Sequence, residues 1–126
     1  MFVGISDKLL VDWLGDKEHI TPADEGEAIG IAGGYYLATG KRATVFMSAD
    51  GFCNALNPLT SWVIPDNIEM DLIISTGRTE KQHIVMTKIL KDLLRLLPYD
   101  PKRISINIIE KKQEDYHCGF TWNYIQ

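Results

Sequence analysis

A chain of 126 residues with 45% hydrophobic and 24% charged residues has the balance of one globular domain and lacks the length for two. The formal net charge of −4 and the lack of a basic cluster argue against nucleic acid or an anionic membrane surface as a partner. No apolar run approaches the roughly 20 residues that cross a bilayer, and the first residues lack a secretory signal pattern. We therefore expect a cytoplasmic protein.

Apolar runs alternate between strand-like and helix-like periods, which is typical of an α/β domain with helices layered on a sheet. In chain order, the pattern predicts a short strand at 19–20, a helix over 25–38, strands at 43–47 and 72–75, a helix over 80–97 and a strand at 104–109. Strict alternation at the start of the last strand predicts a position near the sheet edge.

The predicted helix over 25–38 contains three glycines, Gly30, Gly33 and Gly34. Each glycine costs roughly 1 kcal/mol of helix stability relative to alanine. We therefore expect this helix to pack closely on a neighbouring backbone or on a ligand.

The end of the chain, about residues 110–126, is a charged run followed by Phe120, Trp122 and Tyr124 at alternate positions. This pattern fits a last edge strand whose aromatic face covers the domain. It also fits an arm that docks on a partner subunit, because aromatic residues are enriched at interface cores.

Two polar turns each follow a predicted strand and lead into a helical stretch. The first carries Asp24, Glu25 and Glu27, and the second carries Asp50 and Asn54. In open α/β sheets ligands bind at the carboxyl ends of strands, so two such turns on one edge would form one site. The acids also have a purely structural interpretation, with Asp50 capping a helix, because helix starts favour negative charge.

Several common motifs are missing from the sequence. Asp50-Gly51 lacks the preceding glycine and the paired asparagine of the GDG…N signature that holds magnesium and diphosphate in thiamine enzymes. There is no P-loop, GxSxG elbow or HExxH motif. Cys53 and Cys118 lack metal-ligand spacing, as do His19, His83 and His117, so we expect reduced thiols and no metal site in this chain.

Two stretches, ADEGEAIGIAGGYYLATGKRA at 23–43 and GFCNALNPLTS at 51–61, resemble the pyrimidine-binding domain of phosphonopyruvate and sulfopyruvate decarboxylases, which depend on thiamine diphosphate. The opening residues 2–10 resemble the start of this family as well. The order and separation of the two stretches make the match specific. It implies a three-layer α/β/α fold with a mainly parallel sheet.

The resemblance also implies roles for single residues. Glu25 is implied to hydrogen-bond the N1′ atom of the cofactor's aminopyrimidine, and a carboxyl group in a largely apolar pocket suits proton sharing with a ring nitrogen. Gly26 would permit close approach of the cofactor ring, and Asn54 matches an asparagine of the family. His83 follows a glutamine as in the family and is a candidate for contacting substrate or moving a proton, or else an exposed helix histidine. Two nearby basic residues, Arg78 and Lys81, would help to hold a phosphonate or sulfonate group of the substrate. Alternatively, both are solvated surface charges.

Some residues depart from the family pattern. Asp24 stands where the family usually has asparagine, Ser48-Ala49-Asp50 replaces Gln-Asn-Ser, and the loop from Gly77 to Gln82 is shorter. These differences lie beside the implied site, so they bear on the identity of the substrate.

The resemblance implies that the chain supplies only the pyrimidine-binding half of such an enzyme. The resemblance therefore implies a diphosphate-binding β subunit that holds Mg²⁺, an α2β2 assembly, and decarboxylation of a small 2-oxo acid only when both subunits are present. The alternatives are a subunit of a carboligating thiamine diphosphate enzyme, a non-catalytic pyrimidine-domain partner, or a small-molecule binding module unrelated to thiamine.

Overall fold

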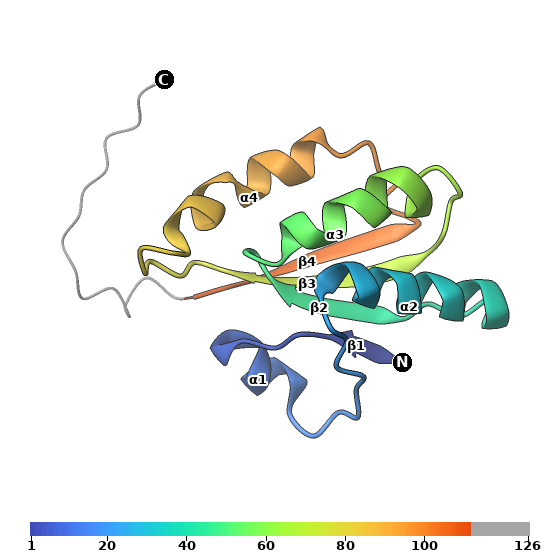
Figure 1. Ribbon diagram of the computed structural model, residues 1–126, viewed down its shortest axis with the longest axis horizontal. Helices are drawn as coiled ribbons and strands as arrows, with labels where there is room; N and C mark the ends of the chain where they lie inside the picture. Colours follow the sequence, from blue (N-terminus) through green and yellow to red (C-terminus); the bar gives the residue numbers. More distant parts are fainter. Residues whose placement is uncertain (112–126) are drawn as a thin grey trace.

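The computed structural model describes residues 1–111, which form an α/β fold around one four-stranded, all-parallel sheet (Figure 1). The strands lie in the order β1-β2-β3-β4. Their bounds are β1 Phe2–Gly4, β2 Thr44–Ser48, β3 Met70–Thr76 and β4 Ile104–Glu110. β4 is an edge strand, as its alternation predicts. The predicted tail at 110–126, with Cys118, lies outside the described residues from residue 112 onward.

Helices cover both faces of the sheet, which confirms the predicted layered α/β architecture. α1 (Lys8–Leu14) lies on one face, and three helices lie on the other (Figure 1). These are α2 Glu25–Thr39, α3 Phe52–Pro58, which continues into the π-helical turn η1 Leu59–Val63, and α4 Ile84–Leu96. No helix within residues 1–111 is both long and apolar enough to cross a membrane.

The core is divided by the sheet into two apolar clusters. Alternate residues of β3 point to opposite faces, so Leu72 and Ile74 join the large cluster under α2, α3 and α4, while Ile73 joins a small cluster under α1. Both faces of a parallel strand need apolar residues because both are covered. This explains why β3 reads as a nearly continuous apolar run.

Two elements, β1 and α1, are not among those predicted from the sequence. β1 has only three residues, too few for a periodic pattern. α1 begins after Asp7, whose carboxylate accepts hydrogen bonds from the backbone N–H groups of Leu9 and Leu10, both at 2.9 Å. An acid before an apolar stretch is a recognised N-cap signal, so α1 was detectable.

The remaining boundaries shift by a few residues. The predicted strand at 19–20 is reduced to an isolated bridge between Ile20 and Val3. The second predicted helix starts at Ile84 and not at Glu80, and the residues before it form a turn in which the N–H groups of His83 and Ile84 both bond the carbonyl of Glu80.

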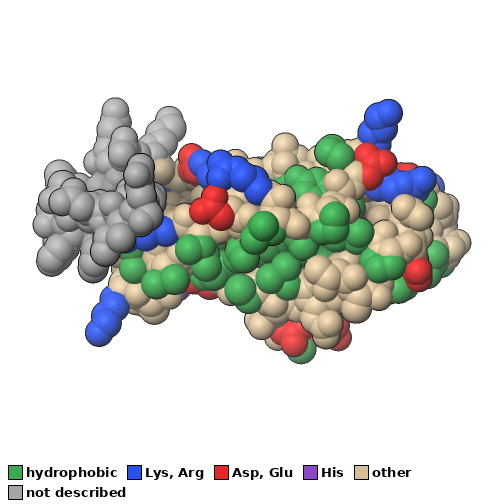
Figure 2. Space-filling model, turned by 90° about the horizontal axis from the view of Figure 1, so that it is seen from above, with side chains coloured by type: hydrophobic (Ala, Val, Ile, Leu, Met, Phe, Trp, Pro, Cys, Tyr) green, Lys and Arg blue, Asp and Glu red, His purple; other side chains and the backbone are tan. Residues whose placement is uncertain are grey.

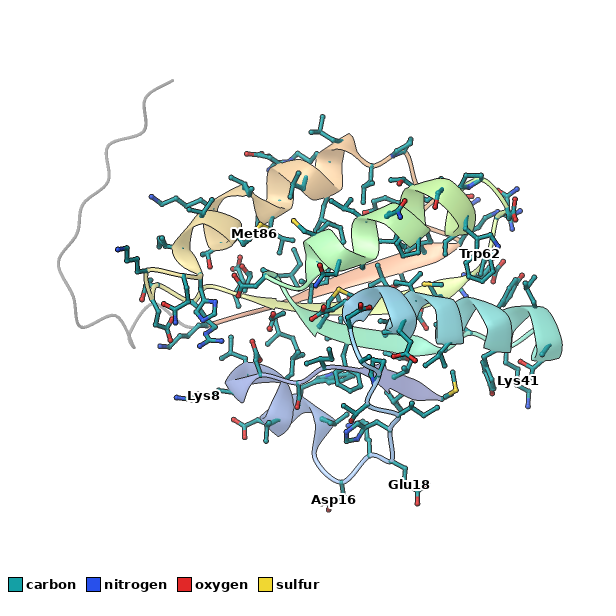
Figure 3. The ribbon with its side chains drawn as sticks, viewed as in Figure 1. Lys8, Asp16, Glu18, Lys41, Trp62 and Met86 are labelled. Carbon is teal, nitrogen blue, oxygen red and sulfur yellow. The ribbon has the colours of Figure 1, made fainter. Side chains whose placement is uncertain are left out.

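The glycines of α2 have two different surroundings. A Cβ on Gly33 would lie 2.5 Å from the ring of Trp62, which packs on the helix at this point (Figure 3). Gly30 and Gly34 face open space, because a Cβ added to either glycine would have no described atom from outside the helix within 4 Å. Close packing is therefore found at Gly33, against a side chain and not a backbone, whereas no described backbone approaches Gly30 or Gly34, and the approach of a ligand there stays a prediction.

Candidate functional site

The two polar turns lie at the carboxyl edge of the sheet. Ile20 pairs with one side of β1 and β2 pairs with the other side. The two segments that follow β1 in the sequence therefore lie on opposite sides of it, and the order of neighbours in the sheet reverses at β1. In open α/β folds such a switch point is where ligands bind, in the crevice outside the carboxyl ends of the strands. The turns that lead into α2 and α3 both reach this edge.

The three acidic residues of the first turn differ in the hydrogen bonds that they make. Asp24 is the N-cap of α2 and accepts a hydrogen bond from the N–H of Glu27 at 2.8 Å. The carboxylate of Glu27 in turn accepts from the N–H of Ala23. This reciprocal pair resembles a capping box and accounts for two of the acids structurally. Glu25, the first residue of α2, makes no capping bond.

Glu25 is held by the second turn. Only 9% of this residue is exposed, and the amide Nδ2 of Asn54 donates a hydrogen bond to its Oε2 at 2.9 Å. No described residue hydrogen-bonds Oε1. A buried carboxylate that meets an amide rather than a cation, and retains one oxygen for another donor, can bind a ligand nitrogen.

Gly51 provides the space for the Glu25 carboxyl group. A Cβ at Gly51 would lie 2.0 Å from Oε1 and 2.3 Å from Cδ of Glu25, so any side chain here would displace the carboxyl group. This contact was not predicted. The sequence signal was a glycine in the turn between β2 and α3, which is typical of close approach between chain segments.

Gly26 has a different surrounding from the one the resemblance implies. A Cβ at this position would lie 3.0 Å from the backbone oxygen of Asn54 and 3.1 Å from Oδ1 of Asp24. The packing of α2 on α3 is therefore enough to explain this glycine.

The second turn also holds Asp50, which does not cap α3. Gly51 is the N-cap of that helix and makes no side-chain cap bond, so the interpretation of Asp50 as a helix cap is wrong. Instead, Asp50 Oδ2 lies 2.5 Å from Nδ1 of His83, across 33 residues of sequence. His83 precedes α4 at its N-cap position, and its side chain is only 17% exposed. The interpretation of His83 as an exposed helix residue is therefore wrong too.

Thr76, the last residue of β3, adds a polar group at the same edge. It is 4% exposed, and its hydroxyl has no hydrogen-bond partner among the described residues. The preceding Ser75 differs, because its hydroxyl donates to Oδ2 of Asp7 at 2.6 Å. A buried polar group without a partner costs free energy, so it calls for a functional explanation.

The basic residues considered for substrate binding lie in the turn before α4. Arg78 Nη2 lies 3.3 Å from Oε1 of Glu80, and Lys81 is exposed. The backbone N–H of Glu80 and then the neighbouring Arg78 lower the pKa of the Glu80 carboxyl group. The structure thus groups Glu25 with Asn54, and His83 with Asp50, whereas Arg78 is paired within its own turn.

Within residues 1–111, no three histidine, cysteine or acidic side chains are grouped as metal ligands would be. The sequence matches no protein-family model and no curated protein.

Proposed function

We propose that this chain is the pyrimidine-binding subunit of a split, cytoplasmic, thiamine diphosphate-dependent 2-oxo acid decarboxylase that acts on phosphonopyruvate or sulfopyruvate. The observation that carries the proposal is the buried Glu25 at the start of α2, aligned by Asn54 and accommodated by Gly51. This glutamate is the residue that the two family-like stretches bring to the ligand-binding edge.

The residues at this edge fit the aminopyrimidine of the cofactor. Glu25 would face the ring nitrogen N1′ and share a proton with it, while Asn54 holds the other carboxylate oxygen in place. When bound, thiamine diphosphate supplies the electron sink that makes loss of carbon dioxide from a 2-oxo acid feasible. The part of this chain is to orient the pyrimidine and to exchange one proton with it.

An apolar surface supports the need for a partner. Figure 2 looks down on the helical layer and shows hydrophobic side chains gathered in a band along it. The exposed hydrophobic residues of α4 are Val85 at 62%, Ile89 at 39% and Leu96 at 79% exposure. Apolar bands of this kind mark interaction sites. We assign the band to the diphosphate-binding subunit, which would hold Mg²⁺ and complete an α2β2 assembly.

The first experiment is co-expression with a candidate β subunit that carries a GDG…N motif. Aldehyde release from phosphonopyruvate, sulfopyruvate and pyruvate is then measured with thiamine diphosphate and Mg²⁺, for each chain alone and for the complex. We expect activity only with both chains. A stable complex without activity on any 2-oxo acid would point to carboligation or to a non-catalytic role.

The test of the site is Glu25→Gln in that complex. We expect kcat/KM to fall by roughly 10²- to 10⁴-fold, the usual contribution of general acid–base catalysis. Glu18→Gln is the matched control, since Glu18 is exposed and points away from the molecule (Figure 3). Unchanged activity of Glu25→Gln would refute the catalytic assignment.

A further inference from the structure

We propose that Asp50 is a positioning residue for His83: it keeps a proton on Nδ1 and leaves Nε2 as the atom that exchanges a proton with the substrate. This inference rests on the proposed function, which does not itself assign any role to Asp50.

The geometry of the pair supports the assignment. An ionised carboxylate can only accept hydrogen bonds, so the 2.5 Å contact with Asp50 Oδ2 requires the proton on Nδ1 of His83. No described residue hydrogen-bonds Nε2. The ring nitrogen opposite the carboxylate therefore retains its bonding capacity for a ligand.

The position of each residue is set by the backbone around it. Asp50 lies in the tight turn after β2, where the N–H of Gly51 bonds the carbonyl of Ser48 at 3.1 Å. His83 is held by the turn in which its N–H bonds the carbonyl of Glu80 at 2.8 Å. Met86, one turn further into α4, lies 3.8 Å from the sulfur of Cys53 on α3 (Figure 3). The starts of α3 and α4 are thus in contact, and they hold the two side chains together.

The charges around His83 are acidic. Besides Asp50, the carboxylate of Glu80 interacts electrostatically with the ring, and the nearby Arg78 is paired with Glu80. Because Asp50 occupies Nδ1, Nε2 is the ring nitrogen through which His83 can pass a proton to the substrate and take one up again.

The reaction requires such a transfer. When a 2-oxo acid loses carbon dioxide, the electron pair of the broken C–C bond stays on the former carbonyl carbon, and a proton must replace the carboxylate there. Nε2–H of His83 would deliver this proton, leaving a neutral ring with its proton on Nδ1. Water then returns a proton to Nε2, so the net reaction consumes one proton for each carbon dioxide released.

The tautomer of His83 can be measured on the full chain without cofactor or partner. ¹H–¹⁵N correlation spectra distinguish a proton on Nδ1 from one on Nε2. We expect Nδ1–H in the unmodified chain and in Asp50→Glu, and a shift towards Nε2–H in Asp50→Ala. The control is Asp92→Ala, which removes a carboxylate from an exposed pair with Arg95 on α4. A ring that carries its proton on Nε2 and none on Nδ1 in the unmodified chain, or no change in Asp50→Ala, would overturn the inference.

The reconstituted complex tests the functional part. Asp50→Ala should lower kcat on the order of 10²-fold with little change in KM, and Asp50→Glu should recover part of the loss. A tautomer change in Asp50→Ala with unchanged kcat would overturn the role of Asp50 in the reaction while leaving the assignment of Glu25 intact. Conversely, if Glu25→Gln is fully active while the tautomer behaves as expected, the proposed function fails and the geometry of the pair stands.

Discussion

The amino and carboxyl edges of the sheet differ in the partners of their partly buried polar and charged side chains. At the amino edge, Arg42 lies 3.1 Å from Glu69 and 3.1 Å from Asp71, and it also donates to the carbonyl of Lys102. Burial opposes the charged form, but the hydrogen bonds to Asp71 and Glu69 prevail and raise the pKa of Arg42. Arg103 adds a contact to Glu69 at 3.7 Å. Here each acid meets a cation.

At the carboxyl edge two acids are paired with cations, Glu80 with Arg78 and Glu110 with Lys91, but three polar groups near the ends of β2 and β3 have other surroundings. Glu25 is bonded by the amide of Asn54, Asp50 by the imidazole of His83, and the hydroxyl of Thr76 has no partner among the described residues. Buried polar groups without a hydrogen-bond partner lower the stability of the fold. Such groups occur at functional sites, where a ligand can supply the missing partner. The comparison shows that the ion pairs of Arg42 contribute to the stability of the amino edge, whereas these three groups of the carboxyl edge retain hydrogen-bonding capacity.

Among the variants that test this comparison between the edges, the largest effect is expected from Gly51→Ala. The new Cβ would overlap Oε1 of Glu25, so the carboxyl group must move by about an ångström or more. We expect kcat/KM of the reconstituted complex to fall on the order of 10²-fold, as misplacement of a catalytic group by about 1 Å can do. Gly30→Ala is the matched control, because its methyl group meets open space and should stabilise α2 by roughly 0.5–1 kcal/mol. Full activity of Gly51→Ala would show that Glu25 needs no such alignment.

Arg42→Met tests the opposite edge. It removes two partly exposed ion pairs and a backbone contact, so we expect the free energy of unfolding in urea to fall by about 1–2 kcal/mol. The kcat and KM of the folded complex should stay unchanged. A loss of activity without a loss of stability would break the comparison between the edges.

Thr76→Val tests whether the unpartnered hydroxyl costs stability. Valine has nearly the same shape and no polar group to desolvate, so the free energy of unfolding should stay constant or rise by up to about 1 kcal/mol. Ser75→Val is the contrasting variant, because it removes the bond to Asp7 and should destabilise the fold. A clear drop for Thr76→Val, measured in urea, would mean that the hydroxyl is satisfied in the folded chain.

The smallest effect is expected for Glu80→Gln. The pKa of Glu80 is lowered in the folded chain from its ordinary value of 4.5, so its ionised form contributes stability above that pH. The contribution is lost as the pH falls through the folded pKa. Because Glu80 is exposed, we expect only a few tenths of a kcal/mol. The urea midpoints of variant and parent should differ slightly at neutral pH and converge as the pH falls below the folded pKa of Glu80. A difference that stays constant as the pH is lowered would contradict the assignment.

Local patterns predict much of this fold. The apolar runs around Leu72 and Ile106 indicate strands, the second near the sheet edge, and the spacing of Met86, Leu90 and Leu93 indicates an amphipathic helix. The N-caps Asp7 and Asp24 are also local signals, although the helix that follows Asp7 is not among the predicted elements. The resemblance to a decarboxylase family singles out Glu25, Asn54 and His83. It does not distinguish a glycine that approaches a carboxyl group from one that faces solvent.

The sequence by itself determined the α/β class, most of the strands and helices, and the side chains available for chemistry, because periodicity, caps and turn residues act over a few neighbouring positions. Only the tertiary structure decided which of them meet. Asn54 reaches Glu25 across 29 residues, and Asp50 reaches His83 across 33. Such contacts depend on the parallel order of the strands, which brings distant turns to one edge and leaves no periodic trace in the sequence.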